Sequence, residues 1–162
     1  MRWIRHLAAG ARARRWFPQA TLDAIHAAIS ASERRHRGEI CFAIENTMPW
    51  RDLARGHSAR QRAHEVFAQL RVWDTQANSG VLIYVLLAER AIEIVADRGI
   101  AARVEQGEWQ GLCDRMRERF AAADYEGGAI EGVNAVSDIL AKHFPADGSA
   151  RGNELSDAPV ML

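Results

Sequence analysis

The apolar run from Val81 to Leu87 constrains the fold of this chain more than any other feature. It is far shorter than the roughly 20 residues of a membrane-spanning helix. Its length and composition instead suit a strand that is covered on both faces. A second strand-like segment, Ala91 to Ala96, follows after only a few residues. So short a link permits a hairpin but no crossover, and we therefore expect these two segments to be antiparallel neighbours in one sheet.

An earlier strand is expected at Glu39 to Asn46, where large apolar residues alternate with other residues at period two. Residues 48–56 are interpreted as a loop. Ser58 and Gln61 then have the spacing of a capping box, which predicts a helix before the hairpin. A crossover through a helix almost always joins parallel strands. The first two strands are therefore expected to point the same way.

Apolar residues at helical spacing predict three further helices: Pro18 to Arg35, Glu108 to Ala123, and a last one that follows the Gly127-Gly128 pair and ends near Phe144. The order of elements predicts an α/β fold in which a small mixed sheet is sandwiched between helices. We divide the chain into a basic amphipathic segment (residues 1–17), an α/β domain (18–145) and a disordered tail (146–162) that has no periodicity.

The composition indicates the number of cores, the net charge and the cellular compartment. A chain of 162 residues with 48% hydrophobic residues can bury one core, and its 21 basic residues balance its 21 acidic ones. Such a chain has no overall field that would attract nucleic acid. Cys41 and Cys113 lie among apolar neighbours, which is typical of buried thiols in a reducing compartment. We expect a cytoplasmic monomer.

The expected topology gathers oxygen-bearing residues at one edge of the sheet. Because the third strand runs back, its end lies beside the beginnings of the other two strands. Calcium prefers carboxylate, amide and backbone oxygens as ligands. We therefore predict a site for Ca²⁺ or another divalent cation whose ligands are Asp74, Asn78, Asp97 and Glu39. Arg98, Gly80 and Gly99 complete this binding edge. In the alternative interpretation, Asp74, Asn78 and Gly80 are ordinary turn residues.

The sequence contains no motif that marks a catalytic centre. Cys113 and Arg119 match the spacing of cysteine-dependent phosphatases, but the residues between them continue a helix, whose amides cannot surround a phosphate. No phosphate-binding glycine motif and no serine-hydrolase elbow appear. The histidines have no close zinc-site spacing and are interpreted as solvated or capping residues. The catalytic residues, if there are any, are unknown.

Met1 to Phe17 contains five arginines, no acidic residue and several large apolar residues, including Trp3. Such a segment can lie on an anionic membrane surface. Alternatively, Trp16 and Phe17 pack on the domain and the arginines are solvated. We favour packing for Phe17 and leave Trp3 open to a membrane or partner contact.

Three segments resemble the TPM-domain family: GEICFAIE (Gly38 to Glu45), the stretch from Ser58 to Arg90, and IEIVADRGI (Ile92 to Ile100). The family's Asn-Gly-Val-Leu motif is similar to Asn78, Gly80, Val81 and Leu82, with Ser79 as an extra residue. The resemblance implies a Rossmann-like three-layer α/β/α sandwich. It also implies binding of calcium or another divalent ion, and an acid phosphatase activity that has been ascribed to plant relatives. The chain resembles the short cytosolic bacterial branch of the family.

The leading functional hypothesis is therefore a TPM-like module that binds a divalent cation, a protein partner, or both, at the edge of the sheet. A partner could be a membrane TPM protein or a LemA-like protein, as the resemblance implies. One alternative is a weak metal-assisted phosphatase, in which an ion held by Asp74 or Asp97 activates water. The other is an adaptor that contacts a membrane surface through the arginine-rich start.

Overall fold

A mixed sheet forms the centre of the computed structural model, which describes residues 2–7, 12–148 and 152–162. The strand order is β3, β2, β1, β4. The strands are β1 (Glu39–Glu45), β2 (Gly80–Leu86), β3 (Ala91–Ala96) and β4 (Val160–Met161). β2 lies parallel to β1, with Glu39 opposite Gly80, and antiparallel to β3. The predicted hairpin and the predicted parallel pair are both confirmed.

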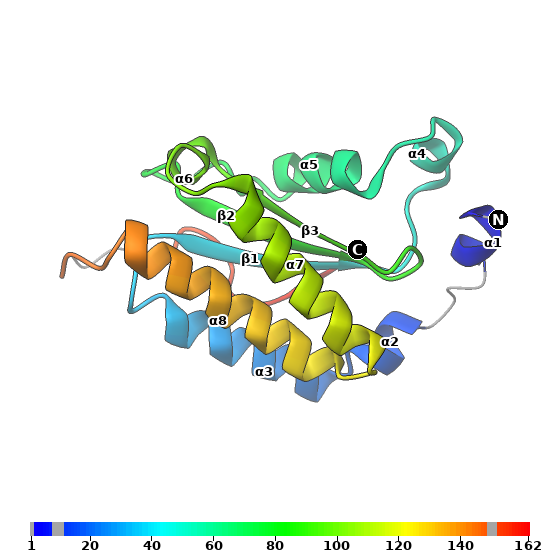
Figure 1. Ribbon diagram of the computed structural model, residues 1–162, viewed down its shortest axis with the longest axis horizontal. Coiled ribbons are helices and arrows are strands. Elements are labelled where there is room, and N and C mark those ends of the chain that lie inside the picture. Colours follow the sequence, from blue (N-terminus) through cyan, green and yellow to red (C-terminus); the bar gives the residue numbers. More distant parts are fainter. Residues whose placement is uncertain (1, 8–11, 149–151) are drawn as a thin grey trace.

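Helices cover both faces of this sheet (Figure 1). α3 (Gln19–Ser32), α7 (Gln106–Ala121) and α8 (Tyr125–His143) lie on one face, and α5 (Ala59–Gln69) lies on the other. The shorter helices are α1 (Arg2–Leu7), α2 (Arg12–Trp16), α4 (Trp50–Ala54) and α6 (Arg98–Ala101). The expected α/β fold, a mixed sheet between layers of helices, is confirmed.

The period-two pattern of the strands divides the interior into two cores. Ile40, Phe42 and Ile44 of β1 belong to the core beneath α3, α7 and α8, which also contains Phe17. Cys41 and Ala43, which point the other way, belong to the core beneath α5. Both cysteines are free and buried, and burial raises the pKa of each thiol to about 11. The expected burial of Phe17 and of the two thiols is therefore confirmed.

Three expectations about local structure are wrong. The expected loop at residues 48–56 contains α4. α8 begins at Tyr125 and includes Gly127 and Gly128, because the Asp124 side chain accepts a hydrogen bond from the Gly127 amide and starts the helix there. The expected disordered tail ends in β4, which pairs with Ala43 and Ile44 of β1.

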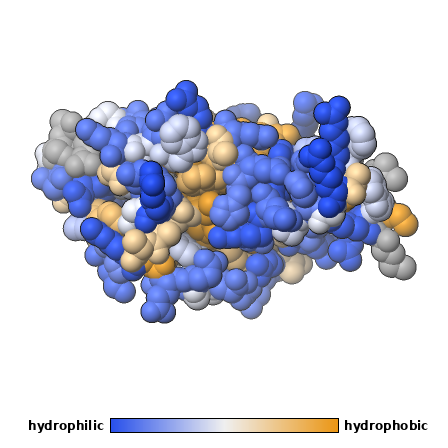
Figure 2. All heavy atoms as spheres, turned by 90° about the horizontal axis from the view of Figure 1, so that it is seen from above, coloured by the Kyte–Doolittle hydropathy of each residue, from blue (hydrophilic) through white to orange (hydrophobic). Residues whose placement is uncertain are grey.

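The described helices include none that is long and apolar enough to cross a membrane. Seen from above, the molecule presents a mostly hydrophilic surface with apolar side chains gathered near its middle (Figure 2).

Candidate functional site

The two loops that were expected to meet at the edge of the sheet do meet. A Cβ atom on Gly99 would lie 2.5 Å from the carbonyl oxygen of Asn78, so the two backbones are in close contact. The Asp97 amide donates to the Gly80 carbonyl at 2.9 Å, and the Glu39 amide donates to the Ser79 carbonyl at 3.1 Å. The backbone geometry on which the predicted cation site depends is therefore present.

The side chains at this edge nevertheless point to different partners. Asp74 is exposed and pairs with Arg71 at 2.6 Å. The Glu39 carboxylate faces the amides of Glu154 and Leu155, at 3.5 and 3.4 Å. Asp97 accepts the amide of Arg98 at 2.7 Å through one oxygen and so caps α6.

These acids do not form a compact ligand group. Among the described residues, Glu39, Asp74 and Asp97 do not bring three ligand atoms within 4.8 Å of one another. Asn78 has a φ of +49°, which suits a turn residue, and Arg98 is exposed. Gly80 and Gly99 both lie where a Cβ atom would collide with a neighbouring backbone. Cation binding at this edge stays a prediction.

A carboxylate pocket that was not expected lies beside Glu39. Glu33 lines a hollow with Glu39, and burial, followed by the charges of Glu39 and Asp157, raises the pKa of Glu33 to about 8. His36 also lines this hollow, and burial lowers its pKa to about 4. The interpretation of the histidines as solvated or capping is therefore wrong for His36, which is buried.

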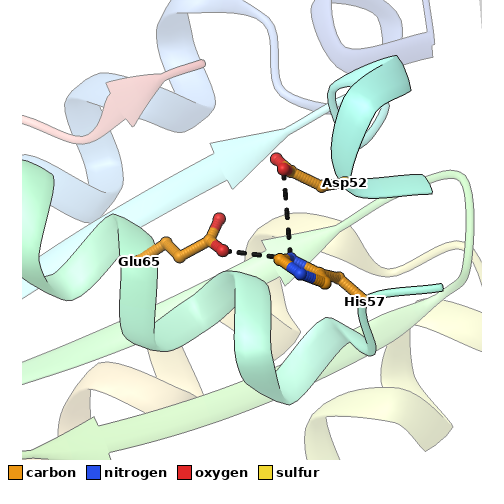
Figure 3. A group of neighbouring side chains, drawn as sticks. All are labelled: Asp52, His57 and Glu65. Carbon is orange, nitrogen blue, oxygen red and sulfur yellow. Dashed lines mark ion pairs between the residues drawn. The ribbon is translucent and has the colours of Figure 1, made fainter. Parts of the chain in front are cut away.

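The compact ligand group lies elsewhere, beyond the carboxyl end of β1 and on the α5 face of the sheet. Asp52 of α4, His57 of the following loop and Glu65 of α5 each offer one ligand atom, and these atoms lie within 4.8 Å of one another. Figure 3 shows the two carboxylates pointing toward the imidazole. The Ser58 capping box fixes the beginning of α5 directly after His57 and so sets the position of the ring relative to Glu65.

The geometry around His57 leaves one ring nitrogen poorly satisfied. Its Nδ1 lies 3.0 Å from Glu65 Oε1 and 3.9 Å from Asp52 Oδ1. The same nitrogen is buried, and it makes no well-aligned hydrogen bond to any described residue. Buried polar atoms normally have a partner, so an atom of this kind calls for a physical explanation.

A buried ion pair between β1 and α5 lies next to this group. Both oxygens of Glu45, the last residue of β1, accept hydrogen bonds from the Arg62 guanidinium, at 2.8 and 2.9 Å. The Tyr84 hydroxyl donates to Glu45 at 2.5 Å. The hydrogen bonds that Arg62 donates to Glu45 raise the pKa of Arg62, and burial raises the pKa of Tyr84, so both groups remain donors. Arg62 also reaches Glu65 at 3.2 Å and Asp52 at 3.8 Å.

Two polar side chains of α1 also contact this region. Arg2 pairs with Glu89 at 2.5 Å and also donates to the backbone carbonyl of His57. His6 lies 3.0 Å from Glu89 and accepts the Met48 amide at 3.1 Å. His6 is buried, so its expected solvated or capping role is wrong as well.

The fold and this polar group together define a class: a three-layer α/β/α domain with a cluster of charged side chains at the carboxyl end of a parallel strand. The TPM domain profile matches residues 14–139, and the chain belongs to the TPM domain family. The NMR structure of the BA42 protein from the psychrophilic bacterium Bizionia argentinensis is similar to this chain, with a TM-score of 0.77 and 26% identity over 88% of this chain and 93% of that one. No curated protein sequence matches the chain.

Proposed function

We propose that this TPM domain binds a divalent cation, and that Asp52, His57 and Glu65 are its ligands. The observation that carries the proposal is the buried Nδ1 of His57, which faces two carboxylates and has no aligned hydrogen bond to a described residue. Two ligand atoms of a tetrahedral zinc ion, each about 2.0–2.1 Å from the metal, are about 3.3 Å apart. The distances of 3.0 and 3.9 Å from Nδ1 to the carboxylates bracket this value.

The local charge supports a doubly charged ion. Glu45, Asp52 and Glu65 lie around the single guanidinium of Arg62, so two formal negative charges are left over. Arg62 gives its shortest hydrogen bonds to Glu45, which leaves Asp52 and Glu65 with weaker contacts to it. A divalent cation would neutralise this excess.

The donor set points to a transition metal or zinc rather than to calcium. A neutral imidazole suits zinc, copper, iron and nickel, whereas calcium takes six to eight oxygen ligands. His57 contributes nitrogen, and the group offers two carboxylates beside it. The chemistry of such a site, with ligand positions left for water, includes activation of a bound water molecule.

Zinc is therefore expected to stabilise the protein against thermal unfolding, by about 2.7 kcal/mol when free zinc exceeds the Kd a hundredfold. The stabilisation should disappear in His57→Ala, because the only nitrogen ligand of the group is removed. It should persist in His64→Ala, which removes an exposed histidine from α5 that lies outside the group. Unfolding curves at increasing zinc concentration, recorded for all three proteins, measure the effect.

Two results would contradict this assignment. Equal stabilisation of His57→Ala and wild type by zinc would place the ion elsewhere. Stabilisation by calcium that is lost in Asp97→Asn, with no response to zinc, would move the cation site to the edge formed by Asp97 and Asn78.

A second candidate function, contact with an anionic membrane surface, is favoured by the orientation of α1. Arg2 and His6 of this helix face the domain, whereas Trp3 and Ile4 are 50% and 66% exposed. Arg5 is also exposed. The helix is therefore amphipathic with its apolar side toward solvent, which is the arrangement of a helix that lies in a lipid interface.

The double variant Trp3→Ser/Ile4→Ser is expected to bind vesicles of phosphatidylglycerol about tenfold more weakly than wild type, because two apolar side chains no longer enter the lipid. Trp73→Ser is the matched control, since Trp73 is 48% exposed but lies in the loop before β2. Sedimentation with vesicles gives the bound fraction. Wild-type protein that stays in the supernatant at low salt would exclude this function.

A further inference from the structure

A cavity with a volume of about 300 Å³ lies on the opposite face of the sheet from the Asp52, His57 and Glu65 group. Its lining comes from α2, the end of β2, the hairpin turn, the last turn of α7 and the beginning of α8, which lie close together in Figure 1. The lining residues that decide its chemistry are Trp16, Arg90, Arg117, Phe120, Ala121 and Tyr125. The cavity lies at the carboxyl end of β2, where open α/β sheets commonly bind their ligands.

One wall of this cavity is aromatic and held in place by ring contacts. The rings of Trp16 and Tyr125 are stacked, with their centroids 4.7 Å apart and their planes inclined by 11°. Phe120 lies against Tyr125 at 5.4 Å. Ring pairs at these distances are mutually attractive and restrict one another. The wall is therefore formed before any ligand arrives, so little ordering is needed for binding.

The charge at the cavity is positive. Arg90 and Arg117 line it, and its described lining contains no Asp or Glu. Arg117 already pairs with Asp114 and donates to the Ile92 carbonyl at 3.4 Å. Arg90 is exposed, and its side chain makes no ion pair or hydrogen bond with any other residue in the described part of the chain. An unpaired guanidinium at the edge of an apolar cavity is suited to a carboxylate.

We propose that this cavity binds a small aromatic carboxylate, whose ring lies against the aromatic wall and whose carboxylate pairs with Arg90. The size of the cavity, its apolar lining and its small number of polar groups are those of a small-molecule site. The ligand class follows from the combination of the Trp16 and Tyr125 rings with the Arg90 guanidinium, which has no ion-pair or hydrogen-bond partner among the described residues. This site is independent of the proposed cation site, because none of its lining residues belongs to that group.

Titration of ¹⁵N-labelled protein with 1-naphthoate tests the proposal. Saturable shifts are expected at the backbone amides of Arg90, Ala91 and Ala121. The neutral analogue 1-naphthalenemethanol should bind about tenfold more weakly, because it has no carboxylate to form a charge-assisted hydrogen bond with Arg90. Acetate, which has no ring, should cause no saturable shift at these amides.

Arg90→Asn tests how much the positive charge of Arg90 contributes to binding. Arg90 has a φ of +53°, and asparagine tolerates this left-handed conformation, so the turn is expected to remain intact. Affinity for 1-naphthoate should fall about tenfold in this variant and should be largely kept in Arg90→Lys. Arg55→Asn, which replaces an exposed arginine that does not line the cavity, should bind as wild type does.

Ala121→Phe fills the cavity from the last turn of α7 and is expected to abolish binding. If this variant does not give the dispersed amide spectrum of a folded protein, the Arg90 variants still test the proposal. Unchanged affinity in Arg90→Asn, equal affinity for the neutral analogue, or the absence of saturable shifts up to the solubility limit of naphthoate would each overturn the proposal.

Discussion

Replacing Arg62 by methionine is expected to lower the free energy of unfolding by about 3–5 kcal/mol, because the substitution leaves a buried charge without its partner. Glu45 is only 3% exposed, and both of its oxygens depend on the Arg62 guanidinium. Tyr84 supplies one further donor, which cannot neutralise the carboxylate. Urea unfolding followed by circular dichroism, in the presence of a chelator, measures the change without a contribution from bound metal.

Two further variants separate the buried pair from the general effect of losing an arginine. Arg60→Met, on the same helix, removes a partly exposed pair with Glu93 and a hydrogen bond to the Ile94 carbonyl, and should cost about 1 kcal/mol or less. The triple variant Glu45→Leu/Arg62→Met/Tyr84→Phe removes all three polar groups and should be clearly more stable than Arg62→Met alone. A loss below 1 kcal/mol in Arg62→Met would show that Glu45 finds another partner or takes up a proton.

Arg62 could have been identified from the sequence. It stands three residues after Ala59 and four before Val66, so it shares a helical face with these two apolar residues. Glu45 alternates with Ile44, so it points to the same face as Cys41 and Ala43, which is the α5 side. A basic and an acidic residue that each occupy an apolar position of facing elements indicate a buried ion pair.

The relative directions of β1, β2 and β3 could be predicted, because they follow from the lengths of the links and from the handedness of crossovers. β4 could not be predicted, since it consists of Val160 and Met161 and two residues carry no periodicity. The beginning of α8 was misplaced because glycines were taken as helix breakers. In the structure, Gly128 lies where a Cβ atom would be 2.7 Å from the Phe120 ring, so close packing requires glycine there.

At the two polar sites, the sequence determines the course of the backbone better than the directions of the side chains. Backbone topology correctly brought the Asp97 corner to the Asn78 turn, but side-chain directions depend on neighbours such as Arg71 and the Glu154 amide, which topology does not supply. Asp52 lies in the segment 48–56 that was expected to be a loop, and His57 follows it directly. Both residues meet Glu65 only through the tertiary structure. No spacing rule in the sequence connects these three residues.

Gly80→Ala is expected to destabilise the protein by about 1–3 kcal/mol, because the site has no room for a methyl group. A Cβ atom at this position would lie 2.0 Å from the carbonyl oxygen of Val72 and 2.9 Å from Cγ1 of the same residue. The carbonyl belongs to the backbone, and Gly80 itself pairs with Glu39 at the beginning of β2. Neither Val72 nor Gly80 can therefore move away without a shift of the backbone. The change in free energy of unfolding is measured by urea denaturation.

Gly107→Ala is the matched control for this prediction. Gly107 lies in the first turn of α7, and a Cβ atom there would meet nothing within 4 Å. Alanine favours a helix over glycine by up to about 1 kcal/mol, so this variant should be as stable as wild type or more stable. The two substitutions add the same methyl group and are expected to act in opposite directions, because only Gly80 lies against a backbone carbonyl. A Gly80→Ala protein as stable as wild type would contradict this prediction. It would mean that the Val72 carbonyl oxygen lies farther from Gly80 than the distance of 2.0 Å to an added Cβ atom indicates.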